Sequence, residues 1–207
     1  MSNIDTTALR CYGHVLIRDA VSGEVLNDSH NAINIENFSE ALALSLSNRA
    51  TGHIYQMVFG NGGSSVSSIG TITYLPPNVV GQNAQLYNET FQKIVDDLSP
   101  LNLDSANNKM RVAHSVGLSY SDIQVTCTLE YSEPAGQLAF DNSPLTNNIN
   151  PSGDSSFVAA YIFDEIGLKS YATSGEGRLL SHVIFHPIQK SLNRAIEVVY
   201  TIRLVVG

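Results

Sequence analysis

The sequence predicts a mainly β protein: an antiparallel β-sandwich or barrel with one amphipathic α-helix packed on it and two long loops. Three observations predict this fold class. Apolar and polar residues alternate over 123–131 and 196–206, apolar residues recur at helical spacing in 36–50, and two long stretches carry turn residues and almost no charge. With 207 residues, a length that one domain can reach, residues 1–207 are predicted to form a single β-rich domain.

The first predicted strands form a hairpin near the N-terminus. The segments 13–19 and 24–28 flank a turn at 20–23, in which Gly23 is expected to take a positive φ. Further strands are predicted at 53–59, 71–75, 157–163 and 179–186.

The two clearest strand patterns lie in the second half of the chain. In 123–131 the odd positions are apolar and the even positions are polar, which predicts a strand with one buried face. In the last strand, 196–206, Val199 and Val205 interrupt the polar side. Both faces of this strand are therefore expected to be partly covered.

The predicted helix spans 36–50. Asn34 is placed to cap its start, and Gly52 follows its end. The segment 89–98 is open between a helix and an extended strand, because its apolar residues fit both patterns nearly equally.

Two long loops are predicted, about 60–88 and 132–156. The first is rich in Gly, Ser, Asn and Pro and contains no charged residue. Loops longer than about 12–15 residues without structure of their own tend to be functional or disordered. We expect these loops to lie across a neighbouring subunit, with plain flexible surface loops as the alternative.

Composition and charge exclude several classes of protein. Eleven basic and nineteen acidic residues give a formal charge of -8, whereas a nucleic-acid-binding protein usually presents a basic face. The N-terminus lacks the apolar region of a secretory signal, and the longest apolar runs are too short to cross a bilayer. We expect a protein made in a cytoplasm, with no membrane and no direct nucleic acid partner, in which Cys11 and Cys127 are buried, reduced thiols.

No catalytic, metal or cofactor site is predicted. His182 and His186 have the spacing of a zinc pair on a helix, but in a strand four residues span about 13 Å. The segment 60–65, GNGGSS, lacks the Lys-Ser/Thr ending of a P-loop. The neighbours Asp164 and Glu165 are expected on opposite faces of a strand, as solvated acids. We therefore expect no enzyme activity and no small-molecule substrate.

Several short patches occur in a recognisable order. They are HNAIN at 30–34, FGNGG at 59–63, LYNET at 86–90, FDEIGL at 163–168, GRLLSHVIFHPI at 177–188 and the final strand at 196–205. This order resembles structural proteins of tailed bacteriophages, especially tail-fibre and fibre-adaptor modules. The resemblance extends in patches over residues 12–206.

The resemblance implies a non-enzymatic virion protein, made in the host bacterial cytoplasm and without a cofactor. Its partners would be copies of itself and other virion proteins of the capsid, neck, tail or fibre. Because no repetitive shaft or receptor-binding tip follows the pattern, we expect a neck/collar or tail adaptor that forms a symmetric oligomer and docks fibres. A head-decoration protein that stabilises the capsid is the alternative. A carbohydrate-binding module, with Tyr171 among its candidate aromatic platforms, is the second alternative.

The candidate interaction and packing motif combines the first loop with the FDEIGL patch. Its residues are Phe59, Gly60, Asn61, Gly62, Gly63, Pro76, Pro77, Tyr87, Glu165 and Gly167. Ile166 and Leu168 are expected to pack inward, and Gly167 to let another backbone approach closely. For Glu165 two hypotheses stay open, a buried carboxylate that holds the 60–63 turn or an ordinary exposed acid, and the second is favoured. Lys190 and Arg194 are expected to be solvated, with pairing to a neighbouring subunit as the alternative.

Overall fold

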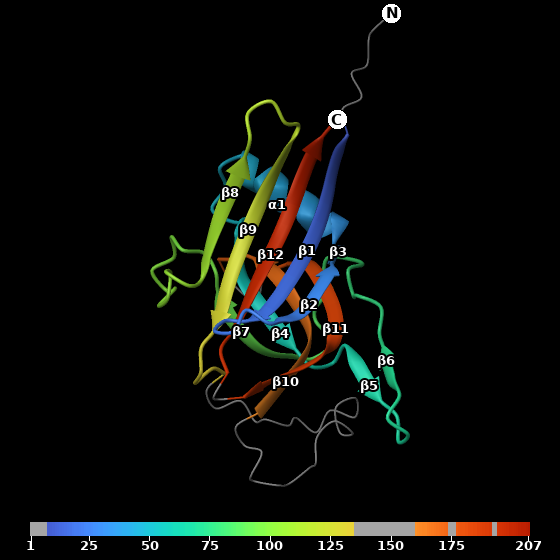
Figure 1. Ribbon diagram of the computed structural model, residues 1–207. Coiled ribbons are helices and arrows are strands. Elements are labelled where there is room, and N and C mark those ends of the chain that lie inside the picture. The colour runs from blue at the N-terminus through green and yellow to red at the C-terminus, as the bar shows by residue number, and fades with distance from the viewer. Residues whose placement is uncertain (1–7, 135–159, 174–176, 192–193) are drawn as a thin grey trace, which may run out of the picture.

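Two antiparallel sheets pack face to face in this computed structural model, which describes residues 8–134, 160–173, 177–191 and 194–207 (Figure 1). Sheet A has the strand order β2-β1-β12-β9-β8, formed by Val25–His30, Leu9–Asp19, Ile196–Val206, Tyr120–Leu129 and Lys109–His114. Sheet B has the order β3-β11-β10-β4-β7, formed by Ala32–Ile33, Leu179–Ser191, Ala160–Ser170, Ile54–Gly60 and Glu89–Ile94. A small separate hairpin joins β5 (Ser64–Val66) to β6 (Ile72–Tyr74). The prediction of a mainly β sandwich with one helix is confirmed.

The main core lies between the two sheets. Strand β12 shows why: alternate side chains from Ile196 to Ile202 are buried, while the intervening ones are partly exposed. From the opposite sheet, Phe59 and Phe163 pack in the same core, with their ring centroids 5.3 Å apart. Burial of one face of each sheet is the driving force for packing the two layers.

The ends of the described chain meet within sheet A. Strand β1 pairs with β12 along its whole length. Beyond the last pair, the Ala8 N–H donates to the Gly207 carbonyl and the Gly207 N–H donates to the Ala8 carbonyl, each at 3.0 Å. The first and last described residues therefore lie side by side.

Helix α1 (Ile35–Leu46) lies across one end of the sandwich (Figure 1). The predicted cap is confirmed, because the Asn34 side chain accepts a hydrogen bond from the Asn37 N–H. The predicted end at residue 50 is wrong by about one turn. Asn48 adopts a positive φ of 55°, a conformation that commonly ends helices, so Gly52 belongs to the following loop.

The strand predictions were mostly confirmed, with informative exceptions. The 20–23 turn has Gly23 at φ 75° as expected, and in the open segment 89–98 the residues Glu89–Ile94 form the extended strand β7. The sequence patterns missed the short strands β3 and β5 and the edge strand β8. Strand β10 continues past the predicted end at residue 163 to Ser170, because its central acids, which suggested a strand end, are buried.

Strand β11 is also longer than predicted. It runs from Leu179 through Pro187 to Ser191. The register with β10 shifts at this point, since Phe163 faces Ile188 but Glu165 faces Ile184. A proline fits such a bulge because no ladder hydrogen bond is required of it there.

Two further expectations concern cysteines and loops. Cys11 and Cys127 are both free, and Cys127 is buried while Cys11 is only partly buried. The predicted 132–156 loop lies almost wholly outside the described residues. Among the described residues, no helix has the length and apolar character needed to cross a membrane.

Candidate functional site

Residues 61–64 and 76–88, which we call the cover, lie over the outer face of sheet B. The cover buries a small apolar cluster against β4 and β11, made of Val58, Ala84, Leu86 and Leu179. This cluster is separate from the main core. The segment predicted as a long loop at 60–88 is therefore a packed layer over much of its length, from which the β5–β6 hairpin projects (Figure 1).

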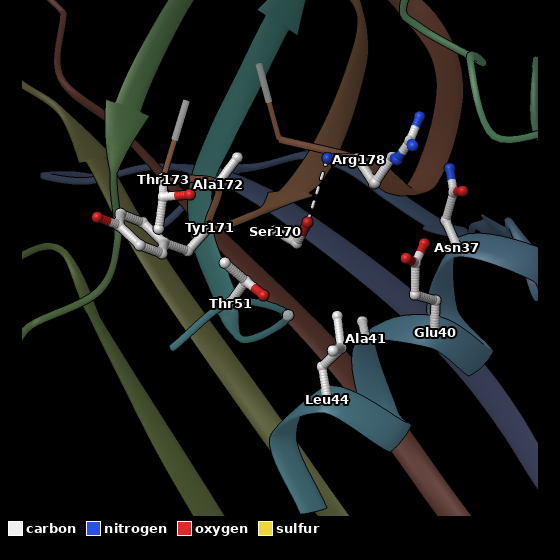
Figure 2. Close-up of a pocket in the computed structure, with 11 residues that line it drawn as sticks. Asn37, Glu40, Ala41, Leu44, Thr51, Ser170, Tyr171, Ala172, Thr173 and Arg178 are labelled. Atoms are coloured by element: carbon white, nitrogen blue, oxygen red, sulfur yellow. Dashed lines mark hydrogen bonds between the residues drawn. The ribbon is translucent and has the colours of Figure 1, made fainter. Parts of the chain in front are cut away.

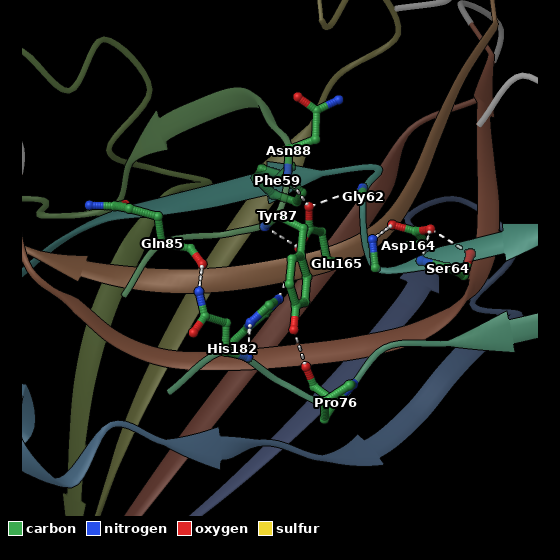
Figure 3. Close-up of polar contacts among 12 residues, drawn as sticks. Phe59, Gly62, Ser64, Pro76, Gln85, Tyr87, Asn88, Asp164, Glu165 and His182 are labelled. Carbon is green, nitrogen blue, oxygen red and sulfur yellow. Dashed lines mark hydrogen bonds and ion pairs between the residues drawn. The ribbon is translucent and has the colours of Figure 1, made fainter. Parts of the chain in front are cut away.

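Asp164 of β10 holds the start of the cover (Figure 3). Its Oδ1 accepts a hydrogen bond from the Gly63 N–H at 2.9 Å, and its Oδ2 accepts from the N–H and the hydroxyl of Ser64 at 2.8 and 2.5 Å. The side chain is fully buried. Burial raises the pKa of Asp164 to about 6; the hydrogen bonds from Ser64 and Gly63 oppose this rise, and the nearby charge of Glu165 adds to it.

Glu165 holds both ends of the cover at once. Its Oε1 accepts from the Gly62 N–H at 3.0 Å and from the Asn88 N–H at 2.8 Å. Its Oε2 accepts from the Tyr87 N–H at 2.9 Å and from His182 Nε2 at 3.0 Å. Full burial alone raises the pKa of Glu165, but the hydrogen bonds from His182 and from the two cover N–H groups outweigh it, so the pKa lies below its usual value.

These contacts decide between the two hypotheses for Glu165. The buried carboxylate that holds the 60–63 turn is confirmed, and the favoured exposed acid is wrong. The prediction that Asp164 and Glu165 face opposite sides as solvated acids is also wrong, because both carboxylates converge on residues 62–64. The register shift in β10 at these residues explains the departure from simple alternation.

Asp164, Glu165 and His182 form a buried group that we call the acid cluster. His182 links this cluster to the middle of the cover. The Asn78 N–H donates to its Nδ1 at 2.9 Å, so this nitrogen carries a lone pair and the ring proton resides on Nε2, where it is donated to Glu165. The ring is fully buried and lies beside the Tyr87 ring, with centroids 5.8 Å apart. His182 is therefore a structural histidine.

Glycines make room for these contacts. A Cβ on Gly60 would lie 2.4 Å from Glu165 Oε1, and one on Gly167 would lie 2.7 Å from the backbone oxygen of Ser181. The predicted close backbone approach at Gly167 is thus confirmed. Ile166 and Leu168, on either side, are buried in the main core as expected.

The two cations near the end of β11 are not solvated as expected. Lys190 is buried, and its Nζ donates to the backbone oxygens of Glu130 and Ser191 at 2.8 and 3.1 Å. Burial lowers its pKa to about 8, against the opposing effect of nearby acids. Arg194 pairs with Asp19 at 2.9 Å and with Glu24 at 3.2 Å, both within the same chain.

The structure brings most of the predicted motif together. Five of its residues form or touch the acid cluster: Gly60, Gly62, Gly63, Tyr87 and Glu165. Asn61 and Pro76 are hydrogen-bonded to Asn88 and Tyr87, two cover residues that bind Glu165. Phe59 belongs to the main core, Gly167 lies beneath the cover, and Pro77 is exposed. Sequence analysis missed Asp164, which it treated as solvated, and the part of His182 in this cluster.

A second feature is a hollow of about 380 Å³ between α1 and the end of β10 (Figure 2). Glu40, Arg178 and Tyr171 line it, together with smaller polar and apolar residues. The Tyr171 ring stacks on His53 at 5.1 Å. Within the described part of the chain, no three His, Cys, Asp or Glu side chains are grouped closely enough to hold a metal ion.

Protein-family models, curated proteins and solved structures give no match to this chain. The chemistry of the site must therefore be inferred from its contacts. Asp164, Glu165 and His182 are fully buried, and their hydrogen bonds are made to the cover or to each other. Such a cluster fixes the shape of a segment, because all of these hydrogen bonds except the one between His182 and Glu165 tie the cover to sheet B.

Proposed function

We propose that this chain is a non-enzymatic structural component of a tailed-phage virion, a neck/collar or tail adaptor that assembles as a symmetric oligomer and docks fibres or other virion proteins. The order of the sequence patches supports the virion assignment. One structural observation supports a docking role: the base of the projecting β5–β6 hairpin is hydrogen-bonded to the buried carboxylate of Asp164.

The projecting hairpin, residues 64–74, is firmly held at its base. Ser64, the first residue of β5, bonds twice to Asp164, and the Leu75 N–H donates to the Gly63 carbonyl at 2.9 Å. Near the free end, Ile69 is 87% exposed. A hairpin with a fixed base and an exposed apolar tip is suited to contact with a neighbouring protein, because fixing the base in advance lowers the entropy cost of binding.

The test uses two matched substitutions at the tip. Ile69→Asp removes the apolar side chain and adds a charge, whereas Ser68→Asp adds the same charge next to it. Each variant is supplied to phage that lack the wild-type chain, and its content in purified particles is measured by quantitative mass spectrometry. We expect Ile69→Asp to reduce incorporation at least tenfold and Ser68→Asp to leave it nearly unchanged, about the effect of one lost interface anchor.

Breaking the particles separates the alternatives. Recovery of the chain with necks or tails supports the adaptor, whereas recovery with heads supports the head-decoration protein. Absence from both fractions contradicts the proposed function.

A carbohydrate-binding module is the second candidate, and the hollow beside Tyr171 is the observation that favours it. The stacking of this ring on His53 competes with its use as a sugar platform, which places this candidate second. Titration with host surface polysaccharide, with Tyr171→Ala as the comparison, tests it. Saturable binding that the substitution removes would favour the module over the adaptor.

A further inference from the structure

The loop between β7 and β8, residues 96–108, displays three leucines to solvent, and we call it the leucine loop. Leu98, Leu101 and Leu103 are 89, 67 and 97% exposed. Single exposed apolar side chains are ordinary, but a group within six residues forms a patch of the kind that marks interaction sites.

The leucine loop is held in shape by its own amide side chains. Asn102 Nδ2 donates to the backbone oxygens of Asp96 and Asn108 at 3.1 and 2.8 Å. Asn108 is buried. Its Nδ2 donates to the backbone oxygen of Asp104 at 3.0 Å, and its Oδ1 accepts from the Thr128 N–H of β9 at 3.0 Å. Because these bonds anchor the loop to sheet A, its leucines cannot fold back onto the chain without breaking them.

An apolar groove of about 210 Å³ lies beside this loop, between α1 and the inner face of sheet A. Its walls are mostly apolar: Phe38, Ala41, Leu42, Ile54, Met110, Ile123, Leu180 and Leu204. Two elements that line it also carry exposed apolar side chains. Leu46 at the end of α1 is mostly exposed, and so is Val112, which pairs in register with the groove residue Ile123.

The loop and the groove share one side of the molecule. Asp96 at the start of the loop lies 3.5 Å from Nε2 of His53, which lines the groove. Asp97 accepts a hydrogen bond at 3.3 Å from the N–H of Met110, which also lines it. When a two-fold axis passes between the loop and the groove, the loop of each copy can enter the groove of the other. The same contact is then made twice.

We propose that the occupant of the groove is the leucine loop of a second copy of this chain, so that two copies form a two-fold dimer through reciprocal insertion. This inference deepens the symmetric oligomer of the proposed function and rests on it. The pairing is apolar, between the three exposed leucines of one copy and the mostly apolar groove walls of the other, and its closure about a two-fold axis singles out a second copy as the occupant.

The test measures self-association of the full chain by sedimentation velocity over a range of concentrations. Leu103→Asp damages the loop, and Ser45→Trp fills the groove that Ser45 lines. Val80→Asp is the matched control, because Val80 is also mostly exposed but belongs to the cover. We expect the first two variants to raise the dimer dissociation constant at least about 30-fold and the control to leave it within about threefold. Unchanged far-ultraviolet circular dichroism and melting temperature show that each variant is folded.

Mixing the two damaged variants gives the decisive result. A mixed pair retains one intact loop facing one intact groove, so the mixture should associate more tightly than either variant alone. Failure to associate on mixing overturns the inference, as does a wild-type chain that stays monomeric. If all variants remain oligomeric, this surface is wrong but the proposed function stands, because particle fractionation tests that function independently. If Leu103→Asp instead abolishes binding to a different virion protein, the inferred partner is wrong.

Discussion

Replacing Glu165 with glutamine tests whether the acid cluster holds the cover in place. Each carboxylate oxygen of Glu165 accepts two hydrogen bonds, one pair at Oε1 and one at Oε2. Glu165→Gln puts an NH2 group at one of these two positions. Two N–H donors then face another donor in a fully buried site, whichever way the amide is turned. A change of tautomer in His182 does not help, because its Nδ1 must accept from Asn78.

The magnitude follows from the two donors left without an acceptor. A buried donor that loses its partner costs about 1–3 kcal/mol, so we expect the free energy of unfolding to fall by about 2–6 kcal/mol. That is a large part of the 5–15 kcal/mol typical of a domain. The loss should be concentrated in the cover, because sheets A and B keep their core.

Urea denaturation and amide hydrogen exchange measure the effect. Glu40→Gln is the matched control, since Glu40 is exposed on α1 and should change stability by no more than about 0.5 kcal/mol. In Glu165→Gln the amides of Gly62, Tyr87 and Asn88 should exchange faster than those of β12. If the variant unfolds at the same urea concentration as the control, the cluster does not hold the cover and the reasoning fails.

Three further predictions follow from buried groups. Gly167→Ala should lower the melting temperature, with a cost of about 1–3 kcal/mol, because the new Cβ meets a backbone oxygen of β11 at 2.7 Å; Gly207→Ala, with open space around it, should not, and equal melting temperatures would contradict the proposed crowding. The raised pKa of Asp164, about 6, means that the folded state takes up a proton more readily than the unfolded chain, whose carboxyl has a pKa near 4. The contribution of Asp164 to the free energy of unfolding is therefore present below about pH 4 and declines as the pH rises to about 6. The difference in free energy of unfolding between wild type and Asp164→Asn should change by up to about 2 kcal/mol over that interval. A difference that does not change with pH would refute this prediction. Burial raises the pKa of Cys127 to about 12, so a thiol reagent at pH 8 should label the partly exposed Cys11 first, as peptide mapping by mass spectrometry would show.

Local patterns predicted the parts of the fold that local burial determines. Strands β9 and β12 each bury alternate side chains against one core, so their alternation was sufficient evidence of strand and face. Strand β8, by contrast, is an edge strand whose side chains are largely exposed, and its alternation of polar and apolar residues lasts only from Lys109 to Val112.

The candidate site was only partly predictable because its contacts join distant segments. Asp164 and Ser64 are 100 residues apart in the chain, and nothing local shows that one will lie under the other. The bulge between β10 and β11 then turns two neighbouring acids towards one turn, against the alternation rule. The glycines in 60–63 and at 167 did carry a usable signal, since close approach is a reason to place glycine in a strand or turn.

The reciprocal bonds between Ala8 and Gly207 have a practical consequence for engineering. A label attached at Ala8 and one attached at Gly207 therefore lie at the same corner of the molecule and report on one location. A circular permutant that joins these two positions by a short peptide, with new ends opened at the exposed 20–23 turn, should keep the hydrogen-bond ladder between β1 and β12 intact.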